Sequence, residues 1–343
     1  MKRGFLTHLV AKNCGNNLKR VVPYAMLAGI ALLFAFHGVS RAEDDDHKRT
    51  AITACGTVIT NPGRYFLAND LKQCPDFGVS IAVSDVALGL RGHTIQGAFG
   101  TSGMITVNGG STGLSNIEIE GPGTVTGGGQ AGIAFENVHH SRVHNLVVVG
   151  NFFGIGVNAG DFTNDQTIAS TASTDNEFRD NVTAGNFGHG ITVNGGNHNR
   201  FTHNNLSGNG LFLGGHGLFL FNAKNNVASH NTTDLNSGAG IDVATFGSEN
   251  TINDNTALGN FGFDLQDENG DCVHKTWTDN SFNSNSPCLH SVVGNPETRY
   301  KPMLAESMGL PLVPIRDRFP RPRLPNLAKR LSALLIGRPD SEF

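Results

Sequence analysis

The sequence predicts an all-β fold of the parallel β-helix type, a solenoid in which every coil adds one short strand to each of its sheets. Three observations lead to this prediction. Gly-rich motifs recur, most clearly at residues 188–193 (Gly-His-Gly-Ile-Thr-Val), 215–220 and 238–243. Asparagines follow each motif at fixed places, and successive repeats are 23, 27, 24 and 25 residues long. A period of this length is typical of a solenoid rather than of a globular domain.

The asparagines form two columns, and the members of each pair are five residues apart. The pairs are Asn181 and Asn186, Asn204 and Asn209, Asn231 and Asn236, Asn255 and Asn260, and Asn280 and Asn285. Parallel strands about 4.8 Å apart place identical residues directly above one another, so that buried Asn can form an amide ladder along the axis. Asn and Gly also tolerate the left-handed backbone of sharp turns. We therefore expect structural, not catalytic, columns.

Composition fits one elongated domain, which we place at residues 55–295 with about eight to ten coils. The chain has 343 residues, 44 glycines and a net charge of −4. No basic stripe is visible in the repeats, which argues against a nucleic-acid partner. Residues 43–54 form a charged lead-in. Residues 296–343 form a Pro- and Arg-rich tail, in which residues 327–336 can form a short amphipathic helix.

The first 42 residues predict a secretory signal peptide. A basic start precedes an apolar run at residues 21–36 and a small-residue site that ends at Ala42. This order is that of a cleaved signal, so we expect a secreted or periplasmic protein with no stable membrane insertion after cleavage. An uncleaved anchor is the alternative, but the run is shorter than about 20 apolar residues and contains Pro23.

Five cysteines fit an exported protein, because removal of the signal would take Cys14 and leave four. Cys55 and Cys74 are 19 residues apart near the first coil, and Cys272 and Cys288 are 16 apart near the last. We expect two local disulfides, each stabilising an end of the solenoid by about 3 kcal/mol in the chain-entropy model. A zinc site is the alternative, but no CxxC spacing supports it.

Both ends of the repeat region resemble a known superfamily. Residues 55–71 (Cys-Gly-Thr-Val-Ile-Thr-Asn-Pro-Gly-Arg-Tyr-Phe-Leu-Ala-Asn-Asp-Leu) and 84–97 (Ser-Asp-Val-Ala-Leu-Gly-Leu-Arg-Gly-His-Thr-Ile-Gln-Gly) are similar to the first coils of bacterial proteins of the pectate-lyase-like superfamily. Residues 263–288 resemble the last coils. The resemblance covers about residues 52–290 and implies a single-stranded right-handed parallel β-helix. That superfamily contains lyases, hydrolases, epimerases and members without an assigned reaction, so no single activity is implied.

One outward column of side chains is the predicted site. Strand alternation places seven residues on the outer face of the first strand of each coil: Thr106, Ala134, Gly156, Thr192, Phe219, Asp242 and Asp264. His189 and His216 come just before that strand. Carboxylates on adjacent coils would either raise one pKa or bind a cation. Phe219 would stack on a sugar ring, with Thr192 beside it as a further substrate contact.

These residues suggest a lyase that acts on uronic acids, which needs a group to neutralise the carboxylate and a base. A Ca²⁺ ion held by Asp242, Asp264 and Asp267 would neutralise the carboxylate. His189, His216 or Lys224 would be the base. Gly-His-Gly also resembles a segment of β-helix polygalacturonases, but the accompanying motifs of that family are missing, so a hydrolase is less expected.

We therefore expect an exported protein that binds an acidic polysaccharide and that, if it is an enzyme, is a polysaccharide lyase. The alternatives are a non-catalytic surface or adhesion β-helix and a periplasmic carbohydrate-binding accessory protein. An insertion at residues 159–176 lengthens one coil. We expect it to form one wall of the site, because insertions in solenoids often lie on the binding face.

Overall fold

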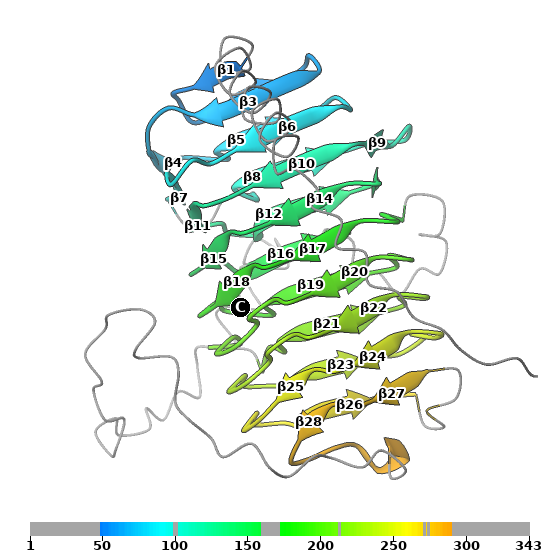
Figure 1. Ribbon diagram of the computed structural model, residues 1–343. Helices are drawn as coiled ribbons and strands as arrows, with labels where there is room; N and C mark the ends of the chain where they lie inside the picture. The colour runs from blue at the N-terminus through cyan, green and yellow to red at the C-terminus, as the bar shows by residue number, and fades with distance from the viewer. Residues whose placement is uncertain are drawn as a thin grey trace, which may run out of the picture. The chain divides into compact units, whose positions relative to one another are not determined.

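The computed structural model describes residues 49–98, 102–158, 172–211, 214–269, 272 and 275–289. These residues form three long sheets whose strands are all parallel and stack coil upon coil (Figure 1). The predicted all-β parallel β-helix is confirmed. The signal peptide, most of the insertion (159–171) and the tail (296–343) lie outside the described residues. Among the described residues, no helix is long and apolar enough to cross a membrane.

Sheet A has ten strands: β1 (Arg49–Ile52), β3 (Gly63–Leu67), β6 (Val86–Gly89), β10 (Ile117–Glu120), β14 (Arg142–His144), β17 (Glu177–Arg179), β20 (Arg200–Thr202), β22 (Val227–Ser229), β24 (Thr251–Asn253) and β27 (Thr276–Thr278). Sheet B has nine: β2 (Thr57–Ile59), β5 (Val79–Ile81), β8 (Ile105–Asn108), β12 (Ala131–Glu136), β16 (Phe153–Val157), β19 (Ile191–Asn194), β21 (Leu218–Phe221), β23 (Ile241–Val243) and β26 (Leu265–Asp267).

Sheet C has five strands: β4 (Leu71–Cys74), β7 (Thr94–Gly97), β11 (Thr124–Thr126), β15 (Val147–Val149) and β18 (Val182–Ala184). Two short pairs complete the coils: β9 (Leu114–Ser115) with β13 (Val138–His139), and β25 (Thr256–Ala257) with β28 (Ser281–Phe282). A 3-10 turn, η3 (Pro287–Leu289), follows the last strand.

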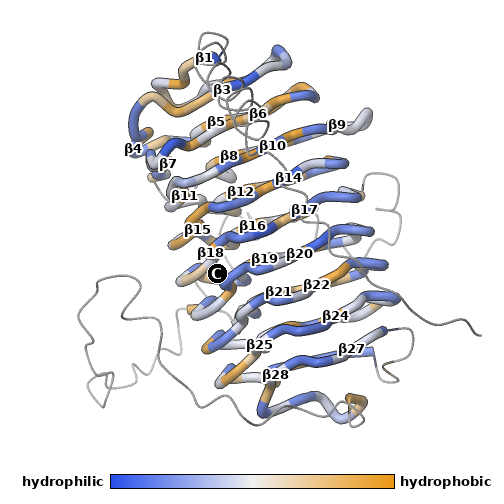
Figure 2. The backbone as a smooth tube through the Cα atoms, viewed as in Figure 1, coloured by the Kyte–Doolittle hydropathy of each residue, from blue (hydrophilic) through white to orange (hydrophobic). Residues whose placement is uncertain are grey.

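The core is a continuous stack of inward side chains, because strand alternation turns every second residue toward the axis. Hydrophobic segments recur from coil to coil among hydrophilic ones (Figure 2). Phe178 and Phe201, on β17 and β20, are fully buried and their rings stack 5.2 Å apart with planes 9° from parallel. Identical residues in identical register thus pack face to face.

The predicted asparagine ladders are present. Asn231 is 1% exposed. Its Oδ1 accepts from the backbone N–H and the side-chain amide of Asn204 on the preceding coil, both at 3.0 Å. Its Nδ2 donates to the carbonyl of Phe201 at 2.8 Å and to Oδ1 of Asn255 at 3.0 Å. A third ladder, not predicted from the sequence, joins Asn176, Asn199, Asn226 and Asn250.

The first strand begins earlier than the sequence indicated. Residues 49–52, assigned to the charged lead-in, form β1 and pair in parallel with β3. Ile52 is 2% exposed and packs into the core. The pairing depends on backbone hydrogen bonds to β3, which the charged composition of the segment does not reveal.

Both predicted disulfides are confirmed. Cys55 bonds to Cys74 and Cys272 bonds to Cys288, with Sγ–Sγ distances of 2.04 and 2.02 Å. Each lies in an end coil of the described helix, where a strand has a neighbour on one side only. Non-reducing peptide mapping of the protein should therefore recover these two linkages. Free thiols at these four positions, or a crossed pairing, would contradict the assignment.

The Asn231→Leu variant should be strongly destabilised. The substitution removes four hydrogen bonds and leaves the buried Asn204 N–H and side-chain amide without their acceptor, which should cost at least about 3 kcal/mol. The measurement is chemical denaturation followed by circular dichroism. Asn283→Ala, at an exposed position, is the matched control and should change stability little. Equal midpoints for the two variants would show that the ladder does not stabilise the fold.

Candidate functional site

Sheet B presents one outward residue per strand at the predicted column. The Cα register joins Thr106, Ala134, Gly156, Thr192, Phe219 and Asp242 on successive coils. The next residue in register is Gln266, not Asp264. The register thus matches the predicted column as far as Asp242, although Thr192 and Asp242 are buried. The predicted neighbouring pair of carboxylates is replaced by one carboxylate beside an amide.

Asp264 has a structural role instead. It is 1% exposed, and its Oδ1 accepts from the backbone N–H and the side-chain amide of Asn260, at 3.1 and 2.9 Å. Its Oδ2 accepts from the backbone N–H groups of Asn283 and Ser284. On the preceding coil Gly240 has the equivalent place, where a Cβ would lie 2.7 Å from Nδ2 of Asn260. Asp264 therefore ends the asparagine ladder that was predicted to continue to Asn285.

Four aromatic rings form a cluster on the outer face of sheet B, which we call the ring cluster: Phe153, His189, His216 and Phe219. Phe153 stacks on His189 at 5.3 Å between centroids, and His189 stacks on His216 at 5.0 Å. Phe219 lies 4.5 Å from His189 and 5.2 Å from His216. All these planes are within 10° of parallel. A face of Phe219 is thus packed against imidazole, which corrects the prediction of a free platform for a sugar.

The histidines are held by the backbone of the next coil. Nδ1 of His189 accepts from the N–H of His216 at 3.0 Å, and Nδ1 of His216 accepts from the N–H of Ala239 at 2.7 Å. A Cβ on Gly238 would lie 2.7 Å from Nδ1 of His216, so the glycine admits the ring. Because a backbone N–H can only donate, each neutral ring carries its proton on Nε2. The Nδ1 lone pair of each histidine is therefore not free to accept a proton from a substrate, contrary to the predicted role as a base.

Burial keeps both rings uncharged. Desolvation, and then the neighbouring His216, lower the pKa of His189 to about 3. Desolvation also lowers the pKa of His216 to about 4. At neutral pH the two rings are therefore N–H donors rather than cations.

Asp242 is the unusual residue of the face. It is 0% exposed, and neither carboxyl oxygen has a hydrogen-bond partner among the described residues. Oδ2 lies 3.5 Å from Nε2 of His216. Burial, and then the charges of Glu268 and Asp267, raise the pKa of Asp242 to about 8. Since the pKa of His216 is lowered, both groups are uncharged between about pH 4 and pH 8.

Thr192 is a second buried polar group without a partner. It is 0% exposed, and within the described chain its Oγ1 makes no hydrogen bond. Thr192 and Asp242 flank Phe219 in the register of sheet B. Buried polar groups are nearly always paired in native proteins, so two orphaned groups on one face indicate a place for a ligand or water.

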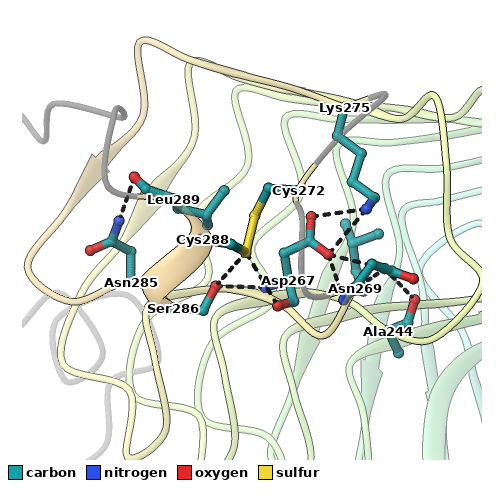
Figure 3. Close-up of a disulfide and its surroundings, with 10 residues drawn as sticks. Ala244, Asp267, Asn269, Cys272, Lys275, Asn285, Ser286, Cys288 and Leu289 are labelled. Carbon is teal, nitrogen blue, oxygen red and sulfur yellow. Dashed lines mark hydrogen bonds and ion pairs between the residues drawn. A yellow bond between two sulfur atoms is a disulfide. The ribbon is translucent and has the colours of Figure 1, made fainter.

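The three acids predicted to bind calcium do not converge. Asp264 ends the ladder, and Asp267 points toward Lys275, whose Nζ lies 3.1 Å from both carboxyl oxygens (Figure 3). Both side chains of this ion pair are buried. The only described group of three potential ligand side chains within 4.8 Å joins Asp267 to Cys272 and Cys288. Those sulfurs form a disulfide, so the group cannot bind a metal through thiolates.

Lys224, the third predicted base, lies apart from the ring cluster. It is exposed in the turn between β21 and β22, where its backbone pairs with Asn197 and Ser248. In the described part of the chain it makes no side-chain contact with His189, His216 or Asp242. Of the predicted catalytic residues, only the two histidines share the face with Thr192, Phe219 and Asp242.

Two aromatic residues of this face were missed. One position lies two residues before the first inward-facing residue of each sheet B strand. On β16, β19, β21, β23 and β26 this position holds Phe153, His189, His216, Ala239 and Phe263, respectively. Spacing alone could have found Phe153 and Phe263. Phe263 is 40% exposed and nearby Phe261 is 92% exposed. The rings of Phe261 and Phe263, unlike that of Phe219, are therefore exposed to solvent.

A groove of about 640 Å³ lies on sheet A and is less suited to be the site. Glu118, Arg142 and Glu177 line it on adjacent strands. The Arg142 guanidinium lies 2.8 Å from Glu177 and 3.6 Å from Glu118. These charges neutralise one another at the surface and leave no single sign of charge to attract a ligand.

The Asp242→Asn variant should become progressively more stable than the parent as the pH rises. The native state keeps the Asp242 proton up to about pH 8, whereas the unfolded chain releases it near pH 4. Raising the pH through this window therefore destabilises the parent, and the amide removes that effect. The difference should grow by about 2.6 kcal/mol between pH 5 and pH 7.

Denaturation midpoints at pH 5, 6 and 7 measure this difference. Asp279→Asn, which changes an exposed carboxylate, is the control and should show a constant difference. A constant difference for Asp242→Asn as well would show that Asp242 ionises in the native state at an ordinary pH.

Comparisons with known proteins agree with this architecture. Residues 131–299 match the model of the right-handed β-helix region family. No curated protein matches. The chain is similar in structure to the enzymatically active domain of tailspike protein 2 of bacteriophage CBA120, with a TM-score of 0.51, 12% identity, and coverage of 70% of this chain and 41% of that one. It thus spans less than half the length of that domain.

A second solved structure is less similar. The A-module of the mannuronan C-5 epimerase of Azotobacter vinelandii has a TM-score of 0.33 and 13% identity, with coverage of 70% of this chain and 88% of that one. At these identities the likeness concerns the fold alone. The stacked coils and the family match over residues 131–299 agree on the fold, which is a right-handed parallel β-helix.

Proposed function

We propose that this protein is an exported carbohydrate-binding β-helix, and that the outer face of sheet B binds an acidic polysaccharide around Asp242. The supporting observation is the pair of buried, unpartnered polar groups, Thr192 and Asp242, on either side of Phe219. Sugar hydroxyls both donate and accept hydrogen bonds, and they would satisfy a hydroxyl and a protonated carboxyl without a cost in charge burial.

The electrostatics of the site suit a uronate. An ionised Asp242 would repel a carboxylate, but the raised pKa keeps Asp242 protonated at neutral pH and able to donate. Nε2–H of His216, 3.5 Å from Asp242, is a second neutral donor on the same face. Further along the face, the exposed rings of Phe261 and Phe263 offer free faces to pyranose rings.

Binding is better supported than cleavage. The lone pairs at Nδ1 of His189 and His216 are occupied by backbone donors, and Lys224 lies away from Asp242. If the protein is a lyase, Asp242 is the side chain suited to move a proton, because its pKa of about 8 is near physiological pH. The tailspike domain named above is described as enzymatically active, and the same fold can carry either role.

Affinity electrophoresis in gels that contain pectate, alginate, a glycosaminoglycan or neutral dextran tests this proposal. We expect at least one acidic polymer to retard the parent protein and dextran to leave it unaffected. Thr192→Val and Asp242→Leu should each reduce the retardation by about tenfold or more in apparent affinity, because each removes a group proposed to bond to the sugar.

Asp279→Asn, on an exposed corner away from sheet B, should behave as the parent does. Ultraviolet absorbance of unsaturated uronides in the same mixtures would reveal a lyase. No retardation by any acidic polymer, or equal retardation of all variants, would refute the proposed site.

A further inference from the structure

The corner between sheets A and C carries a column of residues with left-handed backbone. Each residue directly follows a sheet A strand: Asn145, Asp180, His203, His230, Asp254 and Asp279. The last five each precede a ladder asparagine. Their φ angles lie between 55° and 59°. The backbone N–H of a member donates to the residue just before the next member, as from His203 to the carbonyl of Ser229.

Two histidines are adjacent in this column. The rings of His203 and His230 stack with centroids 5.0 Å apart and planes 9° from parallel. Both residues are exposed, and within the described chain neither ring has a hydrogen bond or an ion pair. The two imidazoles are thus held side by side at the surface without a partner that would compete for their nitrogens.

We propose that His203 and His230 together bind a divalent transition-metal ion such as Zn²⁺. Ladder hydrogen bonds fix the two backbones about one coil rise apart, near 4.8 Å, so that little backbone entropy is lost on binding. Imidazole nitrogens bind zinc at about 2.0–2.1 Å, and rotation of the two exposed side chains brings a nitrogen of each to one ion. Imidazole ligands favour zinc, copper or nickel over calcium.

Neighbouring acids favour a cation at this corner. Asp180 and Asp254 are the members of the column on either side of the histidine pair. Arg179 donates to Asp180 at 2.6 Å, and Asn253 donates to Asp254 at 2.7 Å. Of these two, and within the described residues, only Asp180 is paired with a cationic side chain, so Asp254 adds electrostatic attraction for a cation. The site is separate from the face of sheet B and does not depend on the proposed carbohydrate.

Isothermal titration of the protein with Zn²⁺ at pH 7.5 tests the inference. The parent should bind one equivalent that His203→Asn and His230→Asn each weaken by more than about tenfold, because one of two ligands is lost. Asn is the suitable replacement, since Asn145 has the same left-handed conformation in the same column. Circular dichroism should show that both variants remain folded.

His198→Asn is the matched control. His198 is also an exposed histidine with a left-handed backbone, at φ 55°, but its neighbours in its own column are Asp175 and Asn225. It should retain the zinc equivalent. Excess Ca²⁺ should not compete, because it prefers oxygen ligands. Unchanged zinc binding in both His203→Asn and His230→Asn, or an equal loss in His198→Asn, would overturn the proposal.

Discussion

The amide ladders are the interaction on which the rest of this fold depends. An asparagine buried at a corner satisfies the backbone N–H of the coil before it and takes its own partner from the coil after it, as Asn204, Asn231 and Asn255 do. The geometry works only if every coil has the same register. The same requirement explains why glycines precede the sheet B strands, since a Cβ on Gly240 would lie 2.7 Å from the side-chain amide of Asn260.

Register also produces the chemistry of the outer face. Because each coil repeats the path of the last, a histidine on one coil lies above the backbone of the next, and His216 accepts the N–H of Ala239. The two histidines are therefore part of the scaffold as well as part of the surface. Asp242 differs because no backbone donor of the described residues reaches its carboxyl group, and it stays buried and protonated beside His216. An exception to the pattern of satisfied groups is a stronger indication of function than a repeated residue is.

Periodicity made most of the architecture predictable, but not the ends. The period of the asparagines and the alternation along sheet B place Thr192, Phe219 and Asp242 correctly in register. Counting then failed at Asp264, because Gly262 aligns with Gly238 and Asp264 takes the place of Gly240, so that Gln266 has the outward place. The burial of Asp242 and its protonation state could not be predicted from the spacing of residues. The pKa of Asp242 depends on desolvation and on Glu268 and Asp267, which come together only in the folded coil.

The carboxylate of Asp264 has a consequence for how such a protein changes in length. The ladder that ends at Asp264 has a direction, since the side chains of Asn186, Asn209 and Asn236 each donate to the asparagine of the following coil, and Asn260 donates to the Asp264 carboxyl oxygen. An extra coil gained by duplication before Asp264 would continue this direction without loss. A coil added after Asp264 would follow a carboxylate, which has no side-chain N–H to donate to the next asparagine. Growth of the solenoid by tandem duplication is therefore expected in its interior, with the terminal coil retained as a fixed end.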